Sequence, residues 1–148
     1  MIEKALKEVL NQLPIMTVGG KDYKPVVELG TEDQLRAFLK VKRKSGERYY
    51  PLVWVETPIT QSLETSIVIV LATLNRRTDM GNMDRLDYTF EPVLEPLREN
   101  VMHALKRSKT FKMQDDQWVT NNYGGEKYFN YAMTPDIWDA IRLEVDVR

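Results

Sequence analysis

Apolar residues recur along the chain in two periods, which predict amphipathic helices and buried strands. Near the N-terminus they fall at three- and four-residue steps: Ile2, Ala5, Leu6, Val9, Leu10 and Leu13. This spacing predicts a helix with one buried face, which Pro14 ends. The same steps predict a second helix, with Pro92 and Pro96 near its start, from Phe90, Val93, Leu94, Leu97, Val101 and Leu105.

Other stretches follow the two-residue period of strands. Strict alternation in DAIRLEVDVR, residues 139–148, predicts a strand with one buried face. Alternation from Leu35 to Val41 predicts another strand, joined to YYPLVWVE as a hairpin by a turn at Ser45-Gly46. YYPLVWVE and the run Ser66 to Leu74 lack alternation, so both faces of these strands must be covered. The cover is either a helix of this chain or another subunit.

These elements predict one domain of the α+β class over residues 1–148. We expect a mixed, mainly antiparallel sheet of about four strands, with two amphipathic helices packed on one face. An irregular, aromatic-rich insertion occupies about residues 110–135. The length of 148 residues suffices for one hydrophobic core but is short for two.

Composition restricts the chemistry that the chain can carry. It has no cysteine, which excludes a disulfide, a zinc–thiolate site and a cysteine nucleophile. A formal net charge of -1 gives no overall field that attracts nucleic acid or acidic membranes, so such a contact needs a local patch. No run reaches the roughly 18 apolar residues of a membrane helix, and the N-terminus lacks the pattern of a signal peptide. We therefore expect a protein of the cytosol, or one assembled from it.

The residues that most often carry catalysis or bind metals are isolated in this sequence. The single histidine, His103, has no second histidine or carboxylate motif beside it, and we interpret it as structural. Gly19-Gly20 and Gly124-Gly125 lie outside phosphate-binding signatures and are interpreted as turns. Asp115-Asp116 are interpreted as part of a solvated loop. We expect no catalytic residue, no metal and no cofactor.

Basic residues concentrate around the predicted hairpin turn. We consider them candidates to contact phosphates: Lys40, Lys42, Arg43, Lys44 and Arg48. A charged hairpin tip that only keeps the protein soluble is the alternative.

The loop from Arg76 to Asp87 mixes both charge signs with methionine, a composition typical of interfaces, although a mobile surface loop is the alternative. The aromatic strand residues belong either to the core or to a subunit contact. Together these segments give a candidate subunit interface: Tyr49, Tyr50, Trp54, Arg76, Arg77, Asp79, Met80, Met83, Asp84 and Arg85.

The order of these elements resembles that of the tail terminator or tail-completion proteins of tailed bacteriophages. It comprises an amphipathic helix, a hairpin ending in YYPLVWVE, the strand SIVIVLATLN, a charged loop, the helix FEPVLEPLRENVMHAL and the terminal strand DAIRLEVDVR. The resemblance is one of pattern and covers roughly residues 1–109 and 139–148. In that family a small α/β subunit forms a ring at the head-proximal end of the tail and joins it to the neck.

The resemblance implies a structural virion protein that assembles with itself into a ring, expected to be a hexamer. Its implied partners are the tail tube and the neck or connector proteins, with passing contact to DNA and none to a membrane. The resemblance also implies that the basic residues between Lys40 and Arg48 face DNA or a negatively charged lumen. It would be located in the virion, and in the host cytoplasm during assembly. Two alternatives remain: another neck or connector protein, or a small ligand-binding or adaptor domain on an α/β scaffold. A pocket of the latter would use aromatic residues of the insertion: Trp118, Tyr123, Tyr128, Phe129 and Tyr131.

Overall fold

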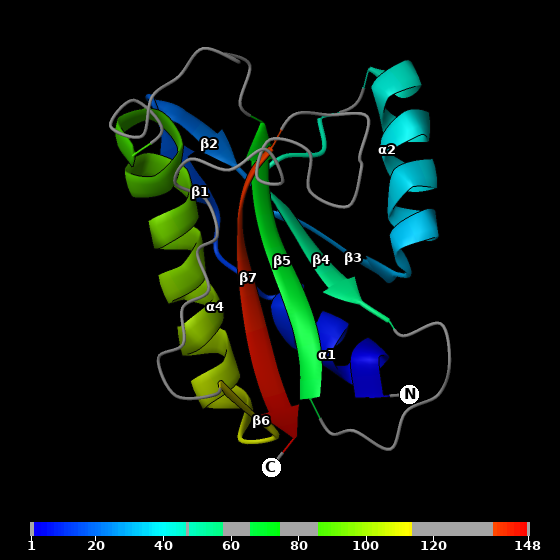
Figure 1. Cartoon of the computed structure of the whole chain (residues 1–148). Helices are drawn as coiled ribbons and strands as arrows, with labels where there is room; N and C mark the ends of the chain where they lie inside the picture. The colour runs from blue at the N-terminus through cyan, green and yellow to red at the C-terminus, as the bar shows by residue number, and fades with distance from the viewer. Residues whose placement is uncertain (1, 47, 58–65, 75–85, 114–137, 148) are drawn as a thin grey trace.

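The computed structural model describes residues 2–46, 48–57, 66–74, 86–113 and 138–147 (Figure 1). The elements in chain order are α1 (Ile2–Leu10), β1 (Met16–Val18), β2 (Lys21–Tyr23), β3 (Val26–Gly30), α2 (Glu32–Ser45), β4 (Leu52–Glu56), β5 (Ser66–Leu74), η1 (Leu86–Leu94), α4 (Glu95–Ser108), β6 (Phe111–Met113) and β7 (Trp138–Val147).

Five strands form the main sheet, in the order β3-β4-β5-β7-β6. β3 and β4 are parallel, while the pairs β4–β5, β5–β7 and β6–β7 are antiparallel. The longest pairing joins β5 to β7, from Ser66 opposite Asp146 to Leu74 opposite Trp138. The predicted α+β fold with a mixed, mainly antiparallel sheet is confirmed. The sheet has five strands instead of the expected four, because the edge strands β3 and β6 were not recognised in the sequence and one expected strand, Leu35 to Val41, is part of a helix.

Helices cover both faces of this sheet (Figure 1). α1 and α4 pack on one face, in a buried cluster that includes Leu6, Leu10, Val53, Val55, Ile69, Leu71, Leu97, Val101, Ile141 and Leu143. α2 packs on the other, in a second cluster that includes Leu35, Leu39, Leu52, Trp54, Val70 and Ala72. The prediction that β4 and β5 are covered on both faces is confirmed, and a helix of the same chain covers the second face.

Residues 32–45 form the helix α2, so the predicted strand from Leu35 to Val41 and the hairpin at Ser45-Gly46 are wrong. The apolar positions of this segment fit the two-residue period of a strand, but Leu35 and Leu39 are also one helical turn apart and fit a helix equally well. Both are buried against the sheet, while Val41, the end of the supposed apolar row, is 65% exposed.

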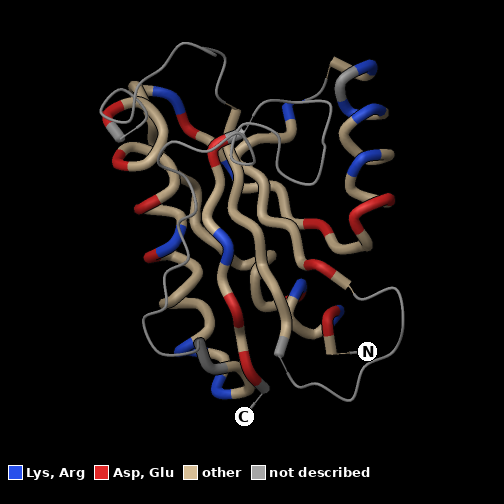
Figure 2. Tube along the Cα trace, viewed as in Figure 1, with Lys and Arg blue, Asp and Glu red and all other residues tan. Residues whose placement is uncertain are grey.

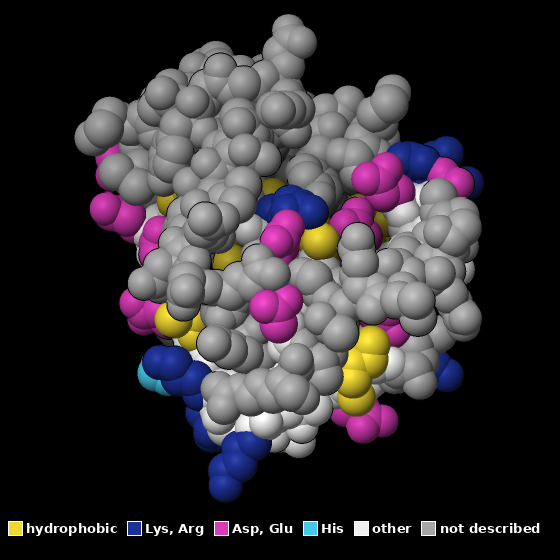
Figure 3. Space-filling model, turned by 60° about the horizontal axis from the view of Figure 1, so that its bottom comes forward, with side chains coloured by type: hydrophobic (Ala, Val, Ile, Leu, Met, Phe, Trp, Pro, Cys, Tyr) yellow, Lys and Arg dark blue, Asp and Glu magenta, His cyan; other side chains and the backbone are white. Residues whose placement is uncertain are grey.

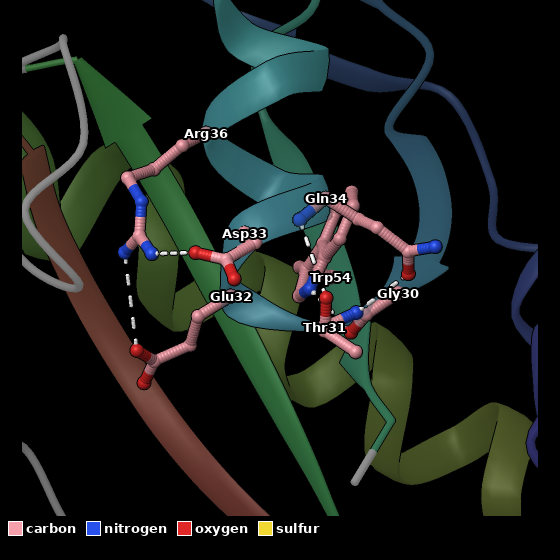
Figure 4. Close-up of polar contacts among 7 residues, drawn as sticks. All are labelled: Gly30, Thr31, Glu32, Asp33, Gln34, Arg36 and Trp54. Atoms are coloured by element: carbon pink, nitrogen blue, oxygen red, sulfur yellow. Dashed lines mark hydrogen bonds and ion pairs between the residues drawn. The ribbon is translucent and has the colours of Figure 1, made fainter. Parts of the chain in front are cut away.

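A capping box at Thr31 starts this helix (Figure 4). The Thr31 hydroxyl accepts a hydrogen bond from the Gln34 backbone N–H, and the Gln34 side chain accepts one from the Thr31 N–H at 2.8 Å. Two amide groups that a helix start leaves without partners are thereby satisfied. Gly46, in the left-handed conformation with φ 72°, ends the helix.

Trp54 on β4 links the end of β3, at Gly30, to the helix α2 (Figure 4). The Trp54 indole N–H donates to the Gly30 carbonyl oxygen at 3.2 Å, and the Phe38 ring lies 5.7 Å from the Trp54 ring. Trp54 is 3% exposed. It is therefore a core residue of this chain, which corrects its assignment to a subunit interface.

The second predicted helix is confirmed, but it begins at Leu86 and has two parts. The first part, η1, is π-helical and contains Pro92, whereas α4 is α-helical and has Pro96 in its first turn. A proline in the first turn of an α-helix removes an N–H that would have no partner there. A proline inside one continuous α-helix would kink it. Here the π-helix ends and the α-helix begins directly before Pro96, so this proline lies in a first turn.

The remaining predicted elements are confirmed at both ends of the chain. α1 is the predicted N-terminal helix, and β7 is the predicted terminal strand, with Ile141, Leu143 and Val145 buried. Gly19-Gly20 form the predicted turn, with φ 59° and 78°, and this turn joins β1 to β2. Two successive positive φ angles suit a two-residue hairpin turn, and glycine adopts them without strain.

Gly30→Ala is expected to lower the free energy of unfolding by about 1–3 kcal/mol, the usual cost of overpacking a core. A Cβ at this position would lie 2.9 Å from Cζ2 of Trp54 and 2.7 Å from Oε1 of Gln34. Urea unfolding followed by circular dichroism measures the loss. In a Trp54→Phe background the loss should be smaller, because phenylalanine has no atom at the Cζ2 position. An equal loss in both backgrounds would contradict this description of the contact.

Candidate functional site

Four of the predicted site residues come together at the C-terminal end of α2. Lys42, Arg48, Tyr49 and Tyr50 line one pocket of about 520 Å³. The remaining lining residues come from the β1–β2 hairpin, the end of α2, β5 and η1: Val18, Tyr23, Gly46, Pro51, Thr73, Leu74 and Val93. Sequence reasoning missed these seven, because they lie in separate segments that only the fold brings together.

Ring contacts hold the cationic and aromatic groups of this pocket in place. The Arg48 guanidinium carbon lies 4.3 Å from the centroid of the Tyr23 ring, and Nη1 donates to the Asp22 carbonyl oxygen at 3.4 Å. The Tyr49 and Tyr50 rings are in contact, with centroids 4.6 Å apart and planes tilted by 41°. A guanidinium over an aromatic ring is attracted to it and loses part of its rotational freedom.

The other predicted basic residues lie on the C-terminal half of α2, rather than at the tip of a hairpin. Lys40 and Lys44 are exposed on either side of Val41, and Arg43 belongs to the same turns of the helix. Cations near the C-terminus of a helix are stabilised by its dipole. We call Lys40, Val41 and Lys44 the basic surface of α2.

A surface of opposite charge runs along η1 and α4. Asp87, Glu91 and Glu99 are exposed, Glu95 is half-buried, and Tyr88 among them is 60% exposed. Burial raises the pKa of the Glu95 carboxyl; Arg98 lowers this pKa, and Glu99 and Glu91 raise it. We call these five residues, Asp87, Tyr88, Glu91, Glu95 and Glu99, the acidic surface of η1 and α4. Sequence reasoning missed it, although its acidic residues recur at every fourth position.

The basic and acidic surfaces lie on opposite sides of the molecule. α2 covers one face of the sheet and α4 covers the other. Figure 2 shows acidic positions along the outer side of η1 and α4, and basic positions along the C-terminal half of α2 at the far side of the sheet. Each molecule therefore carries two different surfaces of opposite sign, and their separation is set by the layers of the fold.

A third charged cluster lies at the N-terminal end of α2. Arg36 forms ion pairs with Glu32 and Asp33 (Figure 4), and Arg142 on β7 pairs with Glu144 at 2.9 Å. Burial raises the pKa of the nearby Glu56 carboxyl; Glu32 raises it further and Arg142 lowers it. These are contacts among exposed and half-buried charges, which typically contribute little to stability.

The lone histidine lies on α4, one helical turn after Glu99 of the acidic surface. His103 is exposed on α4, and Figure 3 shows it on the surface beside basic side chains. Lys106 and Arg107 follow it on the same helix. Among the residues that the structure describes, no group of three or more His, Cys, Asp or Glu side chains could hold a metal ion. None of the described helices is long and apolar enough to cross a membrane.

Part of the predicted interface lies outside the described residues: Arg76, Arg77, Asp79, Met80, Met83, Asp84 and Arg85. The same holds for the aromatic residues of the insertion from Trp118 to Tyr131. Tyr49 is half-buried, whereas Tyr50 is only 8% exposed. Tyr49 therefore offers more surface to a partner than Tyr50.

Comparisons with protein-family models, with curated proteins and with solved structures give no match to this chain. Its function is therefore inferred from the surfaces and the pocket described above, and from the resemblance in the order of its elements.

Glu56→Gln is expected to raise the free energy of unfolding at pH 7, by less than about 1 kcal/mol for a partly exposed group. Burial raises the pKa of this carboxyl in the folded protein above its ordinary value of 4.5. The contribution of this carboxyl to the free energy of unfolding is therefore fully present below pH 4.5, and it is lost as the pH rises through the raised pKa.

Urea unfolding at several pH values tests this expectation. The gain from Glu56→Gln should be present at pH 7 and should disappear once the pH falls below the ordinary value of 4.5. Glu8→Gln, at an exposed position of α1, is the control and should change little at either pH. A gain independent of pH, or a loss of stability at pH 7, would show that the environment of Glu56 is described wrongly.

Proposed function

We propose that this chain is a structural subunit of the ring that completes a bacteriophage tail and joins it to the head–tail neck. The order of the elements supports the proposal through its resemblance to tail terminators. The observation that carries it is the pair of oppositely charged surfaces on opposite sides of the sheet.

A ring built head to tail needs two different, complementary surfaces on each subunit. The basic surface of α2 places Lys40 and Lys44 around Val41, which is 65% exposed. The acidic surface of η1 and α4 places Asp87 and other carboxylates around Tyr88, which is 60% exposed. Each surface thus has an exposed apolar side chain among charges of one sign, and the signs are opposite.

Contact between these two surfaces gives each component a physical role. Val41 and Tyr88 remove apolar area from water, which supplies affinity. The surrounding charges steer the encounter, fix the register and disfavour contacts between two identical surfaces. Because the two surfaces differ, each added copy leaves one of each kind free until rotation closes the ring.

The other parts of the proposal follow from the tail-terminator role. The ring is a homo-oligomer, expected to be a hexamer, whose partners are the tail tube and the neck or connector proteins. DNA passes through its lumen, and the protein resides in the virion after assembly in the host cytoplasm. Residues 76–85, which are also proposed for the subunit interface, directly precede η1 in the chain.

A second candidate, a ligand-binding or adaptor domain, is favoured by a different observation. The pocket of about 520 Å³ at the end of α2 has a size typical of ligand sites. The same pocket is compatible with a ring subunit, or with another neck or connector protein, that holds a segment of a partner.

Cysteine cross-linking tests the head-to-tail contact directly, since the natural chain has no cysteine. Val41→Cys and Tyr88→Cys place one thiol on each surface. The double variant should give, under mild oxidation, a ladder of covalent oligomers that stops at the ring. A mixture of the two single variants should give cross-linked dimers only.

Each single variant alone is the control and should remain uncross-linked, because in a head-to-tail contact like surfaces do not meet. Efficient dimers from one single variant would show a two-fold contact and contradict the proposed arrangement. Absence of any cross-link in the double variant, together with a monomeric mass, would contradict the ring itself.

Charge exchange tests the electrostatic part of the contact. Lys40→Glu with Lys44→Glu should weaken self-association at least about tenfold, because like charges then face one another. Adding Glu91→Lys and Glu99→Lys in the same chain should restore it. Lys4→Glu, at an exposed position of α1, is the matched control and should have no effect. Analytical ultracentrifugation measures the association, and failure of the fourfold variant to recover would rule out this pairing of surfaces.

A further inference from the structure

The pocket at the C-terminal end of α2 combines cations, aromatic rings and aliphatic side chains around one space. We infer that it binds an extended segment of a partner protein that carries an aromatic side chain beside a carboxylate. The pocket adjoins the basic surface of α2 but shares no residue with the two surfaces through which copies of the chain are proposed to meet, so its binding can be tested independently of ring assembly.

Most of the pocket wall is aromatic or aliphatic. The residues that provide it are Val18, Tyr23, Tyr49, Tyr50, Pro51, Leu74 and Val93. The Tyr49 and Tyr50 rings contact each other with their planes tilted by 41°, and tilted rings offer an edge and a face to a further ring. A volume of about 520 Å³ accommodates an aromatic side chain together with the backbone next to it.

Among the described residues that line the pocket, the charged ones are all positive. Lys42 and Arg48 are its ionisable cations, and none of the described residues that line the pocket is acidic. Within the described part of the chain, the Arg48 guanidinium contacts the Tyr23 ring and the Asp22 carbonyl oxygen. A guanidinium carries five N–H donors, so further donors remain for a carboxylate.

The number and setting of these cations favour a carboxylate over a polyphosphate chain. The pocket also borders Gly46, at the C-terminus of α2, where the helix dipole contributes partial negative charge. Nucleic-acid grooves follow the backbone with cations at successive phosphates. This pocket has only two cations, and the negative helix end offsets part of their charge. It therefore suits one carboxylate better than a series of phosphates, and its mainly apolar wall suits an apolar group attached to that carboxylate.

The β1–β2 hairpin favours a peptide over a free small molecule. Val18 on β1 and Tyr23 on β2 both line the pocket, and these two strands form a sheet of their own. Neither strand pairs with any other strand in the described part of the chain. An extended segment can therefore add to this hairpin through backbone hydrogen bonds while its side chains enter the pocket.

Titration of the full-length chain with short capped peptides tests the inference. The probe is acetyl-Val-Asp-Tyr-Asp-Val-amide, and its controls replace both Asp by Asn or the Tyr by Ala. Chemical-shift changes in ¹⁵N–¹H spectra locate the binding and give Kd. We expect saturable shifts at Tyr23, Arg48 and Tyr49, and binding at least about tenfold weaker for each control peptide.

Variants of the protein test whether the positive charge of Arg48 contributes to binding when the fold is unchanged. Arg48→Gln should weaken binding of the probe about tenfold, since it removes the cation but keeps a hydrogen-bond donor. Arg107→Gln, at an exposed position near the end of α4, is the matched control and should bind like the natural chain. The dispersion of the spectrum checks that each variant is folded.

Four results would overturn the inference. These are equal binding of the Asn peptide, tighter binding of a single-stranded oligothymidylate, equally tight binding of free 3-(4-hydroxyphenyl)propionate, and a change in ring assembly on Arg48→Gln. The second would identify a nucleic-acid site and the third a small-molecule site. The fourth would place the pocket in the contact between copies, whereas peptide binding by a monomeric chain would overturn only the proposed ring.

Discussion

The central strands β4 and β5 are apolar on both faces, and the rest of the structure depends on covering the second one. α1 and α4 cover the first face. α2 covers the second, where Trp54 fills the space beneath it and donates to the Gly30 carbonyl oxygen. Glycine at position 30 is what allows the Trp54 ring to approach β3 so closely. The Trp54 ring packs in one buried cluster with Leu35 and Leu39 of α2, so its position helps to fix α2 against the sheet.

The position of α2 in turn sets the arrangement of charge. Its capping box starts the helix at Thr31, and Gly46 ends it beside Arg48 and Tyr49, so the basic end of the helix and the pocket are neighbours. α4 lies across the sheet and carries the acidic surface with η1. One layered fold thus separates two complementary surfaces, which is the geometric requirement for head-to-tail assembly.

The sequence predicted those elements whose period was unambiguous. These were the helix at the N-terminus and the strand at the C-terminus. The strands β4 and β5, which have no alternation, were recognised from their runs of consecutive apolar residues. The sequence misled at α2, because Leu35 and Leu39 fit a strand and a helix equally well. The Thr31 and Gln34 capping box was the local signal that distinguishes the two. The pocket could not be predicted, since no local pattern places Tyr23 against Arg48.

The central claim is that copies of this chain meet through oppositely charged surfaces. The most direct measurement is sedimentation of the unmodified chain at ionic strengths of about 0.01 M and about 1 M, where the Debye length falls from about 30 Å to about 3 Å. We predict a single closed ring at low salt that dissociates toward subunits at high salt. A monomer at both ionic strengths, or an oligomer of two copies that salt does not affect, would contradict the claim.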